Sequence, residues 1–534
     1  MARWARGFSV GYGCVGAVTS AFVLLGTAQS ARADQTLTFE GTVMEGELDH
    51  EFVEFDVPEG VAEIQVEHDD LSGEDILDWG LNDPNGFRGW GGGNSEPAVV
   101  GVSAASRSYL AGPIVAGKWK VVIGKAQIGG GSANYQIVVT LRDVATLPPQ
   151  PERAPYVESP PLASTERFYA GDLHVHSRES GDASPSIEDV VLFAKSQQLD
   201  FVELSEHNTV SQLDFISGVQ AAHKDVLILP GVEYTTYAGH ANGIGATVWV
   251  DHKIGQPGVD IAGAAKAFRD QGALFSLNHP RLDLGNLCIG CAWDHDVSAE
   301  AIDAVEIATS GAALLLIDDT LAFWDSLCDT GRHIAPVGGS DDHTAGKDDG
   351  QFSSPVGKPA TYVYAKELSV PALIEGIRNS RTVVKLDGVT GPMVDLTSEI
   401  PREGDTVFAE RTKLTAKVSQ VEEGAAVRWI KNGEEVFVEQ VSGDPFESTL
   451  EVSVPTEGQD RYRVEVARSG KPITITGYLW VEFKEGVGVE PETPTPESND
   501  GCSCRTAPVK APDGWVGLGL LGPGLVWARR RRRS

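Results

Sequence analysis

The sequence predicts a multidomain protein in which one α/β domain is flanked by two all-β domains and two terminal targeting segments. Strand-length apolar runs alternate with helical patterns in the middle of the chain. The stretches on either side hold only short β-branched runs separated by turn residues. A chain of 534 residues is also too long for one hydrophobic core.

Residues 1–33 have the pattern of a secretory signal peptide. Arg3 and Arg6 precede an apolar stretch of small residues that ends in Ala31-Arg32-Ala33. A positive start, an apolar centre and a small-x-small end are typical of a segment that signal peptidase removes. An uncleaved membrane anchor is the alternative. We therefore expect an exported protein.

The sequence of residues 34–146 predicts a β-sandwich accessory domain. Its general pattern of short strands and glycine-rich turns, rather than any single motif, resembles the jelly-roll domains that accompany secreted hydrolases. Its glycine-rich turns separate expected strands at 36–40, 52–57, 63–67, 119–123 and 135–141. An acidic stretch offers either a calcium site or a solvated edge; it holds Asp69, Asp70, Glu74, Asp75 and Asp78. A proline-rich linker at 147–165 follows.

Residues 166–396 predict the α/β domain. Expected strands lie at 168–173, 201–204, 226–229, 274–277, 305–307 and 334–337, and expected helices at 186–197, 210–223, 261–271 and 314–330. Strands that alternate with helices indicate a parallel sheet or barrel, where functional residues gather at the carboxyl ends of the strands.

Metal-ligand residue types fall at those strand ends. Six of the twelve histidines lie there, each beside a carboxylate or just after an apolar run. His174-Val175-His176 at a strand end points both imidazoles to one side, because residues two apart share a face. Histidine nitrogens and carboxylate oxygens together hold zinc, manganese or iron. The pattern predicts a multi-metal centre.

Three motifs, Gly171 to Ser177, Ser205 to Thr209 and Gly339 to His343, resemble those of the PHP (polymerase and histidinol phosphatase) superfamily. The resemblance implies a distorted seven-stranded β/α barrel over 166–396, two or three divalent ions (Zn, Mn or Fe) and hydrolysis, most often of phosphate esters. Glu206 stands where the family usually has Asp. The implied metal ligands are His174, His176, Asp182, His207, Glu233, His240, His279, Asp341 and His343, with Glu233 as a bridge.

The expected reaction is metal-assisted hydrolysis of a small-molecule ester, with Glu233, Asp341 and His343 in catalytic positions. Arg178 and Arg281 each lie two residues after a proposed ligand, so they are candidates for holding a substrate phosphate or carboxylate. A solvated rim arginine is the alternative for both.

Two other functions stay open. The domain order looks like that of an exported PHP branch named for carbaryl hydrolysis, which implies a carbamate, amide or carboxylic ester as substrate. A non-catalytic surface protein that binds glycan or another cell is the third hypothesis. The formal net charge of −33 argues against nucleic acid as a partner, because phosphate backbones require basic surface.

Histidines and cysteines outside the ligand motifs have structural interpretations. His223, His252, His295 and His333 lack a carboxylate at motif spacing or a strand-end position. Cys288-Ile-Gly-Cys291 has no second such pair, so a structural disulfide is favoured over a zinc site, with one of the three cysteines Cys288, Cys291 and Cys328 left over.

The C-terminal part predicts an Ig-like β-sandwich at 397–484, with Trp429 in its core. A disordered linker at 485–500 precedes a targeting segment at 501–534, which holds Cys502, Cys504, an apolar stretch and a final run of five arginines. This segment resembles the cysteine-containing sorting signals of myxobacteria. The resemblance implies processing by a sorting protease and attachment to the cell surface or outer membrane. A short permanent anchor and a periplasmic location are the alternatives.

Overall fold

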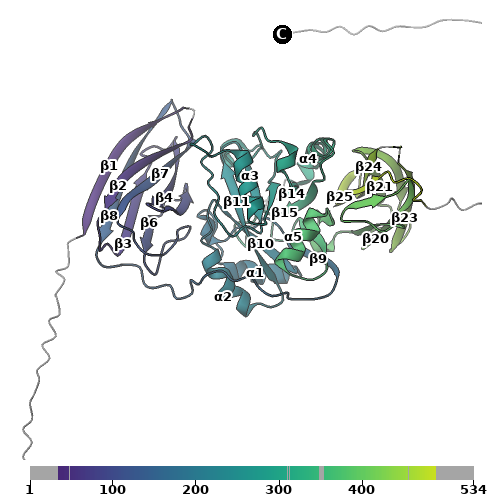
Figure 1. The fold of residues 1–534 in the computed structure, drawn as a ribbon, viewed down its shortest axis with the longest axis horizontal. Helices are drawn as coiled ribbons and strands as arrows, with labels where there is room; N and C mark the ends of the chain where they lie inside the picture. The colour runs from purple at the N-terminus through teal and green to yellow at the C-terminus, as the bar shows by residue number, and fades with distance from the viewer. Residues whose placement is uncertain are drawn as a thin grey trace, which may run out of the picture. The chain divides into compact units, whose positions relative to one another are not determined.

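The computed structural model describes residues 34–46, 48–309, 311, 313–347, 354–454, 456 and 458–488, which belong to one compact unit. The predicted signal peptide and C-terminal targeting segment lie outside the described residues, as does most of the predicted linker. The chain is mixed α/β with several sheets (Figure 1). Among the described helices, none is long and apolar enough to cross a membrane.

Residues 34–146 fold into two four-stranded antiparallel sheets. One has the order β1-β8-β3-β6 and the other β2-β7-β4-β5. Side chains from both sheets, such as Ile64, Val139, Trp119 and Ile123, share one core cluster, as expected when alternating apolar faces pack together. The strands are β1 (Gln35–Met44), β2 (His50–Val57), β3 (Glu63–Asp69), β4 (Ile76–Asp83), β5 (Gly86–Gly92), β6 (Ala98–Gly101), β7 (Gly117–Gln127) and β8 (Ser132–Arg142).

The α/β part contains each strand that the apolar runs predict, and three more. The strand order is β15-β14-β13-β12-β11-β10-β9-β16-β17. Neighbours from β9 to β11 and from β13 to β15 run parallel, whereas β12 runs antiparallel to both of its neighbours. The strands are β9 (Arg167–Asp172), β10 (Phe201–His207), β11 (Leu227–Thr236), β12 (Gly239–Ile244), β13 (Leu274–Leu277), β14 (Ala304–Thr309), β15 (Ala335–Gly339), β16 (Ala360–Ala365) and β17 (Thr382–Lys385).

The chain segments that follow β9 and β15 meet at the carboxyl side of this sheet. Val175 and Asp342 form a parallel bridge, and the Asp341 amide donates to the His174 carbonyl at 2.8 Å. A Cβ on Gly339 would lie 2.3 Å from the His174 Cβ, so only glycine permits this approach. Strands that are distant in the sheet order thus bring their ends to one place.

Helices pack on the outside of these strands (Figure 1). Ser186 and Asp189 form a capping box at the start of the first helix, and Asp260 caps the third. Buried Phe268 of the third helix stacks on Phe275 of β13. The helices are α1 (Ile187–Ser196), α2 (Leu213–Ala222), α3 (Ile261–Asp270), α4 (Ala313–Cys328) and α5 (Val370–Arg378), of which α5 was not predicted.

The C-terminal part is again built from β-strands. A three-stranded sheet, β18-β20-β23, shares a core around Trp429 and Val464 with strands of the larger sheet. Strand β25 pairs antiparallel with β17, so the hydrogen-bonded ladder continues from the α/β part. The strands are β18 (Met393–Ser398), β19 (Thr406–Phe408), β20 (Arg411–Ser419), β21 (Ala426–Lys431), β22 (Glu434–Gln440), β23 (Phe446–Ser453), β24 (Gln459–Arg468), β25 (Lys471–Thr476) and β26 (Leu479–Glu482). The proposed domain boundary at 396/397 falls inside β18 and stays a prediction.

Candidate metal centre

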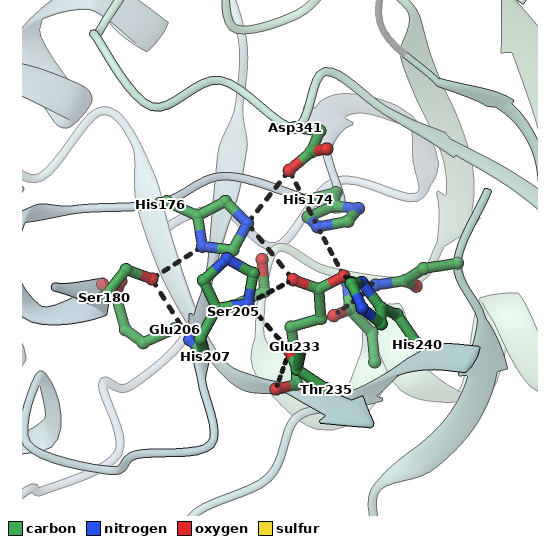
Figure 2. Close-up of polar contacts among 12 residues, drawn as sticks. His174, His176, Ser180, Ser205, Glu206, His207, Glu233, Thr235, His240 and Asp341 are labelled. Atoms are coloured by element: carbon green, nitrogen blue, oxygen red, sulfur yellow. Dashed lines mark hydrogen bonds and ion pairs between the residues drawn. The ribbon is translucent and has the colours of Figure 1, made fainter. Parts of the chain in front are cut away.

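Glu233, at the carboxyl side of β11, lies at the middle of a histidine cluster. Its side chain is fully buried, and its two oxygens face different imidazoles (Figure 2). The distances from Oε1 are 3.4 Å to His174 Nε2, 3.2 Å to His240 Nδ1 and 3.3 Å to His279 Nε2; those from Oε2 are 2.8 Å to His207 Nδ1 and 3.6 Å to His176 Nε2. One carboxylate therefore reaches two sets of nitrogens.

Asp341 and Asp182 complete the cluster. Asp341 Oδ1 lies 3.3 Å from His174 Nε2 and 3.1 Å from His176 Nε2. Asp182 Oδ2 lies 3.3 Å from His207 Nε2 and 3.5 Å from His343 Nε2. The structure thus brings all nine of the ligands implied by the sequence into one group, while their role as ligands stays a prediction.

Two of these residues have strained backbones. His279 has a φ of +28° and Asp341 a φ of +57°, in the left-handed region that residues with a Cβ rarely adopt. Such conformations cost on the order of 1–3 kcal/mol and occur preferentially at functional sites. The backbone thus directs both side chains into the cluster at an energetic cost.

Each of the six imidazoles also has a hydrogen-bond partner other than Glu233 and the Asp182 and Asp341 carboxylates, although for His207 this partner shares Nδ1 with Glu233. His174 Nδ1 lies 3.2 Å from Glu306 Oε1, His176 Nδ1 2.7 Å from Ser180 Oγ and His207 Nδ1 2.8 Å from Thr235 Oγ1. Backbone carbonyls serve the others: Cys291 for His279, Asp341 for His343 and Ile289 for His240. Such outer partners fix the tautomer and orientation of metal-binding histidines.

Several inner atoms lack a hydrogen-bond partner within the described part of the chain. They are Nε2 of His174, Nε2 of His176 and Oε2 of Glu233, all buried. Their neighbours lie within ion-pair range but without hydrogen-bond geometry. Because buried polar atoms without partners are costly, these atoms suit the binding of a cation.

The donors also gather into groups compact enough for an ion each. One contains His174, His176, Glu233 and Asp341; another His176, His207 and His343; a third Glu233, His240 and His279. Mixed nitrogen and oxygen donors of this kind suit zinc, manganese or iron. The residues therefore fit divalent metal ions.

The electrostatics of the cluster agree with this fit. Burial alone would raise the pKa of Glu233, but His174, His207 and His240 hold it well below its ordinary value. Burial opposes the protonation of His343, yet Asp182 and Asp341 raise the pKa of this imidazole to about 9. The carboxylates thus stabilise positive charge in the cluster, which bound cations would provide.

Glu306 and Glu203 are functional candidates that the sequence interpretation missed. Glu306 Oε2 accepts from the His279 amide at 2.7 Å while Oε1 contacts His174. Glu203 is buried beneath the cluster, and a Cβ on Gly231 would lie 2.0 Å from its carboxylate. Both residues interrupt apolar strand runs, and an acidic residue at an inward position of such a run was the available signal.

Glu206, the residue that departs from the family pattern, lies behind the cluster. Burial raises the pKa of its carboxyl group to about 8, although hydrogen bonds from Ser177 and Ser180 oppose this. The Ser180 hydroxyl lies 2.7 Å from His176 Nδ1 and accepts from the His207 amide at 3.1 Å.

A cavity of about 710 Å³ opens onto the cluster. Asp182, His207, Asp341 and His343 line its floor. Its walls include residues of the N-terminal sandwich, namely Ile76, Asp78, Trp90, Gly91 to Ser95 and Ala126, and a loop between β13 and β14 that includes Leu284, Asn286, Leu287, Cys288 and Ile289.

The structure does not bring the two predicted substrate arginines to this cavity. After His176 the chain turns through a 3₁₀ helix at Arg178–Ser180, which leaves Arg178 exposed and lining a separate cavity of about 550 Å³ with Arg107 and Arg153. The Arg281 guanidinium lies over the Phe323 ring at 5.9 Å. Neither arginine is among the residues that line the metal-centre cavity.

Cys288 and Cys291 form a disulfide, which confirms the sequence prediction, and Cys328 is free and buried. The disulfide loop packs tightly, because a Cβ on Gly290 would lie 2.3 Å from the Thr236 carbonyl. Its carbonyls at Ile289 and Cys291 are the partners of His240 and His279. The loop therefore supports the cluster.

Comparisons with known proteins give only distant structural likenesses. No family model and no curated protein matches the chain. A solved two-domain protein from Bacteroides vulgatus, described as containing a predicted PHP-like metal-dependent phosphoesterase, is similar to this chain. The match has 18% sequence identity and a TM-score of 0.35, and it covers 61% of this chain and 99% of that chain. A Pyrococcus furiosus CARDB domain in complex with di-metal ions is also similar. Here the sequence identity is 16% and the TM-score 0.14, and the match covers 17% of this chain and 87% of that chain. TM-scores this low assign neither a fold nor an activity to this chain.

Proposed function

We propose that this protein is an exported metal-dependent hydrolase, with a phosphate ester as its substrate and two or three divalent ions at the histidine cluster. The observation that carries this proposal is the convergence of six histidines and three carboxylates in one group. A cation held there would provide a partner for the buried Nε2 atoms of His174 and His176, which lack a hydrogen bond within the described residues.

Divalent ions held here would lower the pKa of a bound water, polarise the ester and offset charge that develops during its displacement. The protein's own contribution is positional. Glu233 reaches nitrogens through both oxygens, which supports its role as a bridge between ion positions. Glu306 and Ser180 hold the Nδ1 atoms of His174 and His176, so that the Nε2 atoms of both rings face the carboxylates.

The choice of a phosphate ester rests on the three PHP-like motifs and on the suitability of clustered ions for in-line displacement. The same motifs carry the proposal that the α/β part is a distorted seven-stranded β/α barrel. Export, and attachment to the cell surface through the C-terminal segment, are proposals that rest on the sequence of the two chain ends.

One observation favours a second candidate, the hydrolysis of a carbamate, amide or carboxylic ester. Among the described residues that line the cavity, there is no lysine or arginine. Phosphate sites commonly use such side chains for recognition. A substrate with little or no negative charge would fit this lining.

A panel of phosphate, carboxylic and carbamate esters, assayed with metal-loaded protein, tests the proposal. We expect turnover of phosphate esters that stops when a chelator removes the ions. His174→Ala should abolish both activity and metal binding, whereas the control His223→Ala, outside the cluster, should keep both. Turnover confined to carbamate or carboxylic esters would replace the first candidate by the second.

A further inference from the structure

Asp78 and Tyr237 meet in the wall of the metal-centre cavity. Asp78 lies on β4 of the N-terminal sandwich, and Tyr237 lies in the turn between β11 and β12. The Tyr237 hydroxyl donates to Asp78 Oδ2 at 2.7 Å. Both residues line the same cavity as His207 and Asp182. The sandwich therefore contributes an ionisable group to the candidate active site.

The surroundings hold this pair in a fixed position. A Cβ on Gly124, in the neighbouring strand β7, would lie 2.2 Å from the Tyr237 hydroxyl and 3.0 Å from the Asp78 Cβ. The His50 ring stacks on Tyr237 with centroids 5.7 Å apart. Only glycine at position 124 leaves room for the hydroxyl to reach Asp78.

Other acidic groups in the cavity wall are already engaged. Asp182, Glu233 and Asp341 all face histidines of the cluster. Within the described part of the chain, the hydrogen bond from Tyr237 is the one that reaches the Asp78 carboxyl group. Asp78 Oδ1 is thus left for a substrate. No hydrogen bond or ion pair joins this carboxyl group to a candidate metal ligand among the described residues, although His207 and Asp182 act on it electrostatically.

We propose that Asp78 is the general acid of the reaction and that Tyr237 is its positioning residue; this inference rests on the proposed hydrolase function. Hydroxide forms a bond to the phosphorus while the bond from phosphorus to the leaving oxygen breaks. The Asp78 carboxyl group gives its proton to the leaving oxygen, which departs as an alcohol. The resulting carboxylate regains a proton from water, so atoms and charge balance.

The protonation of the pair agrees with this role. Burial raises the pKa of Asp78 to about 6, although the hydrogen bond from Tyr237 opposes the rise. An acid whose pKa lies near the working pH transfers protons most effectively. Burial and the neighbouring Asp78 raise the pKa of Tyr237 well above its ordinary value, so the phenol stays a hydrogen-bond donor.

The test compares leaving groups on Asp78→Asn, Tyr237→Phe and the control Asp75→Asn, which alters an exposed loop of the same sandwich. Asparagine still accepts the Tyr237 hydrogen bond, so Asp78→Asn should fold and keep its metal content. We expect kcat for alkyl and phenyl phosphates to fall about a hundredfold or more, because a poor leaving group needs the proton. For p-nitrophenyl phosphate, whose leaving group needs none, the loss should be less than about tenfold. Tyr237→Phe should show a smaller loss with the same dependence on the leaving group.

An equal loss across all leaving groups, with metal content unchanged, would overturn the assignment of Asp78 and leave the hydrolase function in place. Unchanged kinetics in Asp78→Asn would overturn it as well. A wild-type protein that binds metal but hydrolyses none of the esters would instead refute the proposed function, and the general acid with it.

Discussion

Glu306 connects two candidate ligands that belong to different strands. Its carboxylate holds the His174 ring through one oxygen and the His279 backbone through the other, and it is itself buried. Removing its charge leaves both imidazoles in place but weakens the basicity and orientation of His174. The loss of the Glu306 charge should therefore change the metal affinity more than the folding stability.

We expect Glu306→Gln to weaken metal binding by roughly 10- to 100-fold, the usual cost of losing such an outer partner. Isothermal titration with zinc or manganese measures this. Glu300→Gln, at an exposed position, is the matched control and should bind metal as the wild type does. An unchanged affinity in Glu306→Gln would show that His174 does not depend on this carboxylate.

At the scale of elements, the carboxyl ends of the strands carry the site and the disulfide loop closes it. Ile289 and Cys291 supply the carbonyl partners of His240 and His279, and the loop also lines the cavity. The Ile289 and Cys291 carbonyls stay beside these histidines only while the disulfide restrains the backbone of the loop.

The double variant Cys288→Ser/Cys291→Ser should therefore bind metal more weakly, by roughly tenfold or more, with little change in overall secondary structure. Competition with a chromogenic chelator measures the affinity. Cys328→Ala, which removes the free buried thiol, is the control and should leave metal affinity unchanged. Equal affinity in the double variant and the wild type would exclude a supporting role for the loop.

The elements also show what the sequence can and cannot predict. Leu274–Leu277 is apolar apart from Ser276 and forms β13 with the predicted bounds. Strand β12 was not predicted, because His240 and Asn242 interrupt its small apolar residues, yet the whole strand is buried. The candidate ligands could be predicted because they lie at strand ends, and the local sequence pattern predicts where these strands end. Arg178 was misplaced because the turn after His176, rather than its spacing from a ligand, determines where its side chain points.

At the scale of the whole molecule, the N-terminal sandwich is part of the cavity wall, and the C-terminal strands extend the central sheet through β17 and β25. Lys385, at the end of β17, lies at this second connection. Its side chain is fully buried, and Nζ donates to the Val389 carbonyl at 2.9 Å and to Gln420 Oε1 at 3.3 Å.

Burial lowers the pKa of Lys385 to about 8. Between about pH 8 and pH 10 the folded protein releases this proton while the unfolded chain keeps it, so this group makes stability rise with pH. Methionine does not titrate, so Lys385→Met should lack this rise. The free energy of unfolding of the variant should therefore fall further below that of the wild type as the pH increases, by at most about 1.4 kcal/mol per pH unit. Urea unfolding at several pH values measures the difference. A stability difference that does not vary with pH would contradict the shifted pKa.

The metal content of the wild-type protein, purified without chelator and measured by inductively coupled plasma mass spectrometry, tests the central claim most directly. The convergence of six histidines on Glu233, Asp341 and Asp182 predicts two or three divalent ions per chain, and His174→Ala should retain fewer. A wild-type protein that holds less than one ion per chain, and takes up none on incubation with zinc, manganese or iron, would contradict the account.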